Sequence, residues 1–323
     1  MAGLLNGAWM QREPLPVRYD SNLTAQSGGF HRRTVPQYLA ETAAREPEVC
    51  EWLGRMPQLV ADLADRWSLS VGEPFEPGGQ CSWTAPATDA SGTALVLKVA
   101  FRFPGGDERD EAAGLRAWDG NGAVRVHAAT DSERSYALLL ERCLPGTVLG
   151  QLLPEPAQDV VVAALLSQLW IQPHGTHPFR PLAQMCATWA DEFEAEYAAA
   201  PLADRIDPGL ARAGIALFRE LPGTATDQVL LCTDLHAENI LAASRQPWLV
   251  IDPKPYVGDP AYDTLQHMLN CDSRLAADPA GLADRMAGLA GLDPGRVRAW
   301  LFARAVQESI GSPLLWQVAR QLA

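Results

Sequence analysis

The spacing of apolar residues divides this chain into a helical lead-in, a segment of strands and a long helical segment. From Gln37 to Trp67, apolar side chains recur every three or four positions, which predicts two or three helices with interruptions near Pro47 and Pro57. Residues 1–34 show no steady period and are interpreted as a loose leader or extension. The folded part of the chain is therefore expected to start after this leader.

Five short apolar runs separated by turn residues follow the helical lead-in. A helix with an acidic first turn, Asp107–Asp119, is predicted after the third run, where it suits the helix dipole. The runs predict an antiparallel five-stranded sheet with one helix, in an N-terminal lobe of residues 35–142. The predicted strands are Ser68–Phe75, Gln80–Ala85, Thr93–Phe101, Val124–Ala128 and Tyr136–Leu140.

From residue 143 to residue 323 the period is mostly helical, which predicts a C-terminal helical lobe. The chain is thus expected to be an α+β protein of two lobes joined by a short hinge, with a ligand cleft between them. Two short strands are predicted at Val229–Cys232 and Trp248–Ile251. The predicted helices are Gln158–Ile171, Pro181–Ala199, Pro208–Glu220, Ala261–Leu269, Gly281–Leu289 and Pro294 to about Leu322.

Composition narrows the class of protein. A net charge of -13 argues against a nucleic-acid partner and is compatible with a cationic small molecule, although acidic surfaces often serve solubility alone. No apolar run approaches the roughly 20 residues of a membrane span, and residues 1–9 lack the basic flank of a signal peptide. The six cysteines form no C-x-x-C pair, so reduced thiols and a cytoplasmic location are expected. A monomer and a homodimer both remain open.

Lys98 and Lys254 are the only lysines among 26 lysine and arginine residues. An arginine bias is typical of a GC-rich genome, but it does not explain where these two lie. Lys98 ends an apolar strand, from which its compact charge can reach nucleotide phosphates. It needs a carboxylate partner on the following helix, for which Glu111 is the first choice and Glu108 the second.

Three further polar residues stand at the spacing that a kinase uses. Asp234 precedes Asn239 by five positions and Asp252 by eighteen. Asp234 is placed to accept a hydroxyl proton, while Asn239 and Asp252 offer the oxygen ligands that Mg²⁺ prefers. An aspartate after a strand is often only a cap or turn residue. The combination with Lys98 in kinase order favours phosphoryl transfer.

A nucleotide site also needs contacts to phosphates and base. Gly78, Gly79 and Ser82 are candidate phosphate contacts, although there is no G-x-G-x-x-G motif and a hairpin turn explains the two glycines equally well. Glu141 and Cys143, in the hinge segment, complete the expected nucleotide-binding set.

Substrate contacts are expected in the C-terminal lobe. Asp191 and Glu194 belong to an acidic run on a predicted helix, which is either a solvated face or a site for a cationic group. Lys254 is a candidate for contact with substrate or phosphate, or for pairing with a neighbouring carboxylate. Asp263 is a further candidate, with a capping role after Pro260 as the alternative.

Several longer motifs resemble one family. The chain is similar to the aminoglycoside/hydroxyurea antibiotic resistance kinases, the branch that includes the streptomycin 6-phosphotransferases, within the protein-kinase-like aminoglycoside phosphotransferases. The similarity extends from about Trp52 to the C-terminus. It rests on Leu97-Lys98-Val99, Asp234-Leu235-His236, Ile251-Asp252-Pro253-Lys254 and Gly258-Asp259-Pro260-Ala261-Tyr262-Asp263, the last two of which are typical of this branch.

The resemblance implies a bilobal protein-kinase-like fold, ATP, Mg²⁺ and transfer of the γ-phosphoryl group to a small hydroxylated antibiotic. Streptomycin or a related aminoglycoside is the expected acceptor, with resistance as the outcome. Hydroxyurea, a nucleoside antibiotic and a metabolite are alternatives. The family pattern has His-Gly before the catalytic aspartate, where this chain has Cys232-Thr233. A β-branched residue at the glycine position keeps a nucleotide-binding pseudokinase open as a further alternative.

Overall fold

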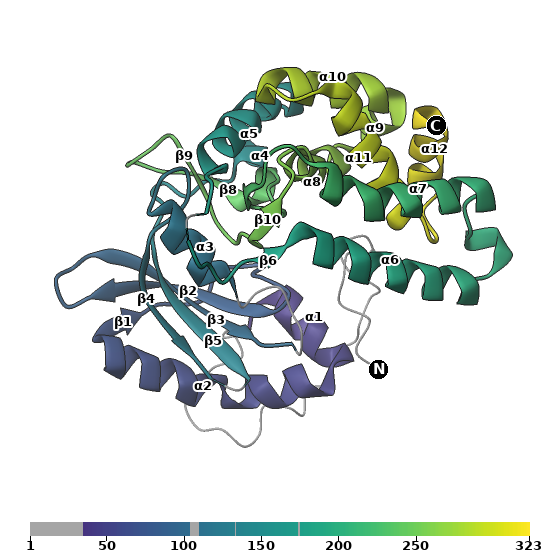
Figure 1. Ribbon diagram of the computed structural model, residues 1–323. Helices are drawn as coiled ribbons and strands as arrows, with labels where there is room; N and C mark the ends of the chain where they lie inside the picture. Colours follow the sequence, from purple (N-terminus) through teal and green to yellow (C-terminus); the bar gives the residue numbers. More distant parts are fainter. Residues whose placement is uncertain (1–34, 104–109, 133, 174) are drawn as a thin grey trace. The chain divides into compact units, whose positions relative to one another are not determined.

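The computed structural model describes residues 35–103, 110–132, 134–173 and 175–323, which form two compact units (Figure 1). The first unit contains the described residues up to Ala112 and Val124–Arg142. The second contains Ala113–Ala123 and Cys143–Ala323. The leader predicted at residues 1–34 and the second-choice partner Glu108 lie outside the described residues.

The first unit is built on an antiparallel sheet with the strand order β1-β2-β3-β5-β4. The predicted five-stranded sheet and its α+β class are therefore confirmed. Helix α3, Glu111–Trp118, lies between β3 and β4 in the chain. The strands are β1 Leu69–Val71, β2 Ser82–Asp89, β3 Ala94–Phe101, β4 Val126–Asp131 and β5 Ser135–Glu141.

Helices α1, Gln37–Arg45, and α2, Pro47–Trp67, pack on one face of this sheet (Figure 1). Pro47 occupies the first turn of α2, where a backbone N–H has no partner within the helix, so proline costs no hydrogen bond there. Pro57 was expected to interrupt the helix, but α2 continues through it. Buried side chains lie on both sides of this proline along one helix face, so tertiary packing offsets the lost hydrogen bond. They are Val49, Trp52, Met56, Val60 and Leu63.

The period of two along β3 separates its core residues from its lysine. Leu95, Leu97 and Val99 belong to the core formed with α1 and α2. Lys98 lies between two of these residues, so its side chain is on the opposite face of the sheet. The strand period thus places this lysine on the face that α1 and α2 do not cover.

The second unit is mainly helical, with two small sheets. One contains β6, Arg180–Pro181, β10, Tyr256–Gly258, and β7, Val229–Leu231; the other pairs β8, Ile240–Ala242, with β9, Trp248–Val250. The helices are α4 Leu149–Leu152, α5 Glu155–Leu169, α6 Leu182–Ala199, α7 Pro208–Glu220, α8 Leu265–Leu269, α9 Asp272–Ala277, α10 Pro279–Ala290, α11 Pro294–Gln307 and α12 Pro313–Leu322.

The prediction of one helix from Pro294 to about Leu322 is wrong, because α11 and α12 are separate helices. Gly311 adopts a left-handed φ of 71° and Pro313 starts α12, a combination that ends one helix and begins another.

The segment Ala113–Ala123 packs with the helical unit although it lies between two strands of the sheet in the chain. Trp118 Nε1 donates to Leu169 O at 2.8 Å, and Val250 N donates to Gly122 O at 2.9 Å.

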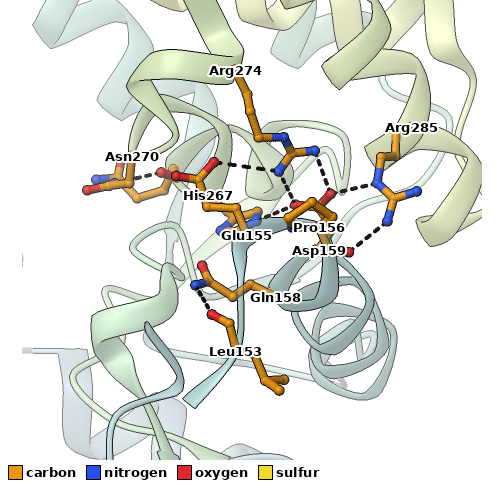
Figure 2. A network of polar contacts seen from close by, with 10 residues as sticks. Leu153, Glu155, Pro156, Gln158, Asp159, His267, Asn270, Arg274 and Arg285 are labelled. Carbon is orange, nitrogen blue, oxygen red and sulfur yellow. Dashed lines mark hydrogen bonds and ion pairs between the residues drawn. The ribbon is translucent and has the colours of Figure 1, made fainter. Parts of the chain in front are cut away.

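A buried carboxylate on α5 binds three helices of the second unit (Figure 2). Asp159 contacts His267 Nε2 of α8 at 2.9 Å, Arg274 of α9 at 2.9 and 2.7 Å, and Arg285 Nε of α10 at 2.6 Å. Burial by itself raises the pKa of this carboxyl, but the hydrogen bonds from the three basic side chains outweigh it and hold the pKa well below its usual range. We call this cluster of Asp159, His267, Arg274 and Arg285 the Asp159 cluster.

None of the helices among the described residues is both long and apolar enough to span a bilayer.

Candidate active site

The first unit carries a buried ion pair on the sheet face opposite α1 and α2. Lys98 Nζ lies 2.7 Å from Glu111 Oε2, and the residues are only 6% and 1% exposed. Tyr136 Oη donates to the same carboxylate oxygen at 3.2 Å. The predicted partner of Lys98 is therefore its observed partner. The pair holds a compact positive charge in one position, as a phosphate contact requires.

The predicted phosphate turn has a structural explanation of its own. Gly78 has a φ of +77°, and a Cβ there would lie 2.4 Å from Pro36 Cβ. A Cβ on Gly79 would lie 2.6 Å from Ser82 Oγ. Tyr38 N donates to Pro77 O at 3.2 Å, which ties the turn to α1. These contacts account for both glycines without a ligand, so phosphate binding by Gly78, Gly79 and Ser82 stays a prediction.

Glu141 and Cys143 also make contacts within their own units. Glu141 Oε2 accepts from Arg125 N at 3.0 Å, at the end of β5. Cys143 is buried, and a Cβ on Gly146 would lie 2.9 Å from Cys143 O, so the turn after it is tight. Their contact with a nucleotide stays a prediction.

In the second unit, two of the three kinase-spaced residues, Asp234 and Asn239, lie in the loop between β7 and β8, and the third, Asp252, follows β9. Asn239 Nδ2 donates to Asp234 O at 2.9 Å, which leaves the amide oxygen of Asn239 for a cation. Ile251 N donates to Asn239 O at 2.9 Å across the β8–β9 hairpin, so Asp252 follows directly beside Asn239. Asp252 has a φ of 53°, an uncommon conformation that often marks a functional residue.

Asp263 holds the turn that precedes Asp234. Its Oδ2 accepts from Cys232 N and from Trp170 Nε1, both at 3.0 Å, and its Oδ1 accepts from Thr233 N at 2.5 Å. Burial raises the pKa of the Asp263 carboxyl to about 6, although these hydrogen bonds act in the opposite direction. The side chain is buried and occupied by backbone donors. This arrangement favours the structural alternative over the predicted substrate contact.

Asp259 anchors the other end of the same motif. It accepts from Ala261 N at 3.0 Å, from Arg296 Nε at 2.6 Å and from Trp300 Nε1. The two aspartates of the Gly-Asp-Pro-Ala-Tyr-Asp motif thus connect α11 and α5 to the turn before Asp234. These contacts restrain the backbone on either side of the loop that carries Asp234.

The acidic pair predicted to meet a substrate lies on the surface of α6. Asp191 and Glu194 are 76% and 60% exposed at their side chains, and both accept from Arg219 NH2 of α7, at 2.7 and 2.9 Å. This pairing favours the solvated-face interpretation. Arg219 was not singled out from the sequence, because it stands 25 to 28 residues away.

Lys254 contacts the proposed base. Its Nζ lies 3.0 Å from Asp234 Oδ2, and Asp234 is buried. Of the alternatives left open for this lysine, pairing with a neighbouring carboxylate is therefore present. Thr233 was considered only as a departure from glycine, yet its hydroxyl donates to Lys254 O.

The donor set fits magnesium better than a transition metal. Among the described residues, no group of three or more His, Cys, Asp and Glu side chains is arranged to hold a metal. Asp252 offers a carboxylate and Asn239 an amide oxygen. Two such protein ligands are enough for Mg²⁺ when substrate phosphates and water supply its remaining ligands.

Solved structures of small-molecule kinases share this fold. A thermostable mutant of the aminoglycoside phosphotransferase APH(4)-Ia, in a ternary complex with ADP and hygromycin B, matches with a TM-score of 0.55 and 16% identity, over 81% of this chain and 97% of that one. APH(3'')-Id from Streptomyces rimosus, in complex with ADP and streptomycin, matches with a TM-score of 0.52 and 18% identity, over 78% and 98%. The chain therefore has the protein-kinase-like fold of the phosphotransferases.

Sequence comparison then places it within that class. Residues 66–311 match the model of the aminoglycoside/hydroxyurea antibiotic resistance kinase family, and the chain belongs to this family. It is 34% identical over 284 residues to a streptomycin 6-kinase of Streptomyces griseus, covering 85% of this chain and 90% of the relative. It is 35% identical over 272 residues to a hydroxyurea phosphotransferase of Kitasatospora aureofaciens, covering 83% and 75%. The predicted family is thus confirmed, and the chain is a phosphotransferase of the antibiotic-resistance class.

Proposed function

We propose that this protein is an ATP- and Mg²⁺-dependent O-phosphotransferase that phosphorylates streptomycin or a related aminoglycoside. The observation that carries the proposal is the shared loop and hairpin that hold Asp234, Asn239 and Asp252 together. Identities of 34% and 32% to two streptomycin 6-kinases, each over 85% of this chain, support the choice of acceptor.

Each residue has a distinct part in this reaction. Asp234 accepts a hydrogen bond from the acceptor hydroxyl and takes its proton as the hydroxyl oxygen attacks. Asn239 and Asp252 hold Mg²⁺, which neutralises phosphate charge when bound. In the other unit, Lys98 contacts the nucleotide phosphates, and Glu111 keeps its ammonium in place. Gly78, Gly79, Ser82, Glu141 and Cys143 are the proposed further nucleotide contacts.

Turnover of a defined acceptor tests the proposal. Release of ADP from ATP and Mg²⁺ is measured with streptomycin, other aminoglycosides and no acceptor. We expect streptomycin to stimulate release, and Asp234→Asn to lower kcat by about 10³-fold while the Kd for ATP changes by about twofold at most. Asp227→Asn, at an exposed aspartate before β7, is the matched control and should keep parental kcat. Parental turnover by Asp234→Asn would refute the role of Asp234.

Hydroxyurea is the second candidate acceptor, because the hydroxyurea phosphotransferase is as similar to this chain as the streptomycin kinases. The ratio of kcat/KM values for the two acceptors decides between them. Binding of ATP without turnover of any acceptor would favour the pseudokinase alternative.

A further inference from the structure

Lys254 is held against the Asp234 turn by its backbone as well as by its charge. Its N–H donates to Cys232 O at 2.9 Å, and its carbonyl accepts from Thr233 Oγ1. Its ammonium lies 3.0 Å from Asp234 Oδ2. Pro255, the next residue, packs so closely on α3 that a Cβ on Gly114 would lie 2.9 Å from it. The fold therefore holds the backbone of Lys254, and the ion pair with Asp234 holds its ammonium.

Thr233 adopts an unfavourable conformation while it makes one of these bonds. Its φ is 54°, in the left-handed region that a β-branched residue rarely occupies. Glycine would adopt this conformation without strain, but glycine has no hydroxyl to donate to Lys254 O. Asp263 holds the amide of the same residue. The threonine therefore adds a direct restraint on Lys254 that the glycine of the family pattern does not provide.

The ammonium lies between a buried carboxylate and solvent. Asp234 is buried, whereas the Lys254 side chain is 32% exposed. An ammonium has three N–H donors, and one is directed at Asp234. Burial lowers the pKa of the neighbouring His236; the charge of Asp234 opposes this effect, and the charge of Lys254 adds to it. Lys254 is then a fixed positive charge beside the proposed base.

We propose that Lys254 is a catalytic residue whose ammonium donates to Asp234 and to an oxygen of the transferred phosphoryl group. The proposal rests on the function proposed above. In that reaction the O–H bond of the acceptor breaks and its proton goes to Asp234. The acceptor oxygen bonds to the γ-phosphorus, and the bond from that phosphorus to the bridging oxygen breaks, leaving the electron pair on ADP. Lys254 stabilises two anionic groups that would otherwise repel each other.

Kinetics of two substitutions test this role. Lys254→Met should lower kcat by about 10²- to 10³-fold, the loss found when one donor to a transition-state charge is removed, with the Kd for ATP changed by about threefold at most. Lys254→Arg should recover part of that loss, because it restores the charge without the compact geometry. Arg298→Met, at a surface cation paired with Asp284, is the matched control and should keep parental kcat. A Lys254→Met variant with parental kcat overturns the proposal.

A phosphoryl analogue separates contact with the phosphoryl group from mere positioning of Asp234. ADP is titrated with Mg²⁺, with and without aluminium fluoride, and melting temperatures are recorded in parallel. Lys254→Met should lose about 30-fold or more of the affinity gained with aluminium fluoride, whereas Asp234→Asn should retain it. An unchanged gain in Lys254→Met would assign the lysine to positioning and overturn the proposal. Absence of turnover by the parent enzyme would instead count against the proposed function.

Discussion

The Asp159 cluster provides a strong test of the packing of the helical unit. Asp159→Asn keeps the side-chain volume but removes the negative charge that faces His267, Arg274 and Arg285. Removing one partner of a buried ion pair costs about 3–5 kcal/mol. Because the Arg274 and Arg285 side chains are partly exposed, water recovers part of that loss, and we expect about 3 kcal/mol. For a chain of this size, that corresponds to a melting temperature lower by about 4–5 °C.

Thermal unfolding followed by circular dichroism measures this loss. Asp284→Asn is the matched control, because Asp284 pairs with Arg298 on the surface and its removal should cost well under about 1 kcal/mol. The pH dependence gives a second readout. The pKa of Asp159 is depressed in the folded protein, so its stabilisation is present above about pH 4 and is lost as the pH falls further. If both variants melt together and share one acid profile, the cluster does not stabilise the fold as argued.

Three further outcomes follow from the site and the sheet. Lys98→Met should lower stability by about 3–5 kcal/mol and abolish tight ATP binding, while a second change, Glu111→Leu, restores stability in urea unfolding but not ATP affinity. Gly78→Ala should lower stability by about 2–4 kcal/mol, against about 1 for Gly92→Ala, where the same strain occurs in open space; equal melting temperatures would contradict this. Burial raises the pKa of Asp263 to about 6, so this carboxylate becomes protonated as the pH drops through 6, and kcat should fall. Because the folded state then holds a proton that the unfolded state has lost, the free energy of unfolding should decrease as the pH rises from about 4 to 6. A flat kcat profile between pH 5 and about 7 would contradict the positioning role of Asp263.

Local patterns were sufficient for the sheet and for much of the proposed catalytic set. The continuous apolar run around Lys98, bounded by turn residues, placed this lysine on a strand, and an acidic helix start placed Glu111 on the following helix. The spacing of Asp234 and Asn239 within one loop needed no knowledge of distant contacts. These features depend on residues close in the chain, which is why the sequence alone could predict them.

Long-range contacts were beyond such patterns. Asp159 meets basic residues 108 to 126 positions away, and no periodicity indicates which carboxylate will be buried among them. The sequence could not decide whether the acidic run on α6 is a solvated face or a substrate site, because its partner Arg219 lies on a different helix, α7. Strands β8 and β10 were not predicted, whereas β7 and β9, which are equally short, lie in four-residue apolar runs. Pro57 was misjudged because packing, rather than local propensity, decides whether a helix tolerates proline.

The scarcity of lysine has a practical consequence for chemical labelling. Apart from a free α-amino group, only Lys98 and Lys254 offer an amine to an amine-selective acylating reagent in this chain. Lys98 is 6% exposed and bound to Glu111, whereas the Lys254 side chain is 32% exposed, so acylation should start at Lys254. On the proposed role of Lys254, a nucleotide bound with a phosphoryl analogue should protect this single amine, and mass spectrometry of the peptide that contains it measures that protection.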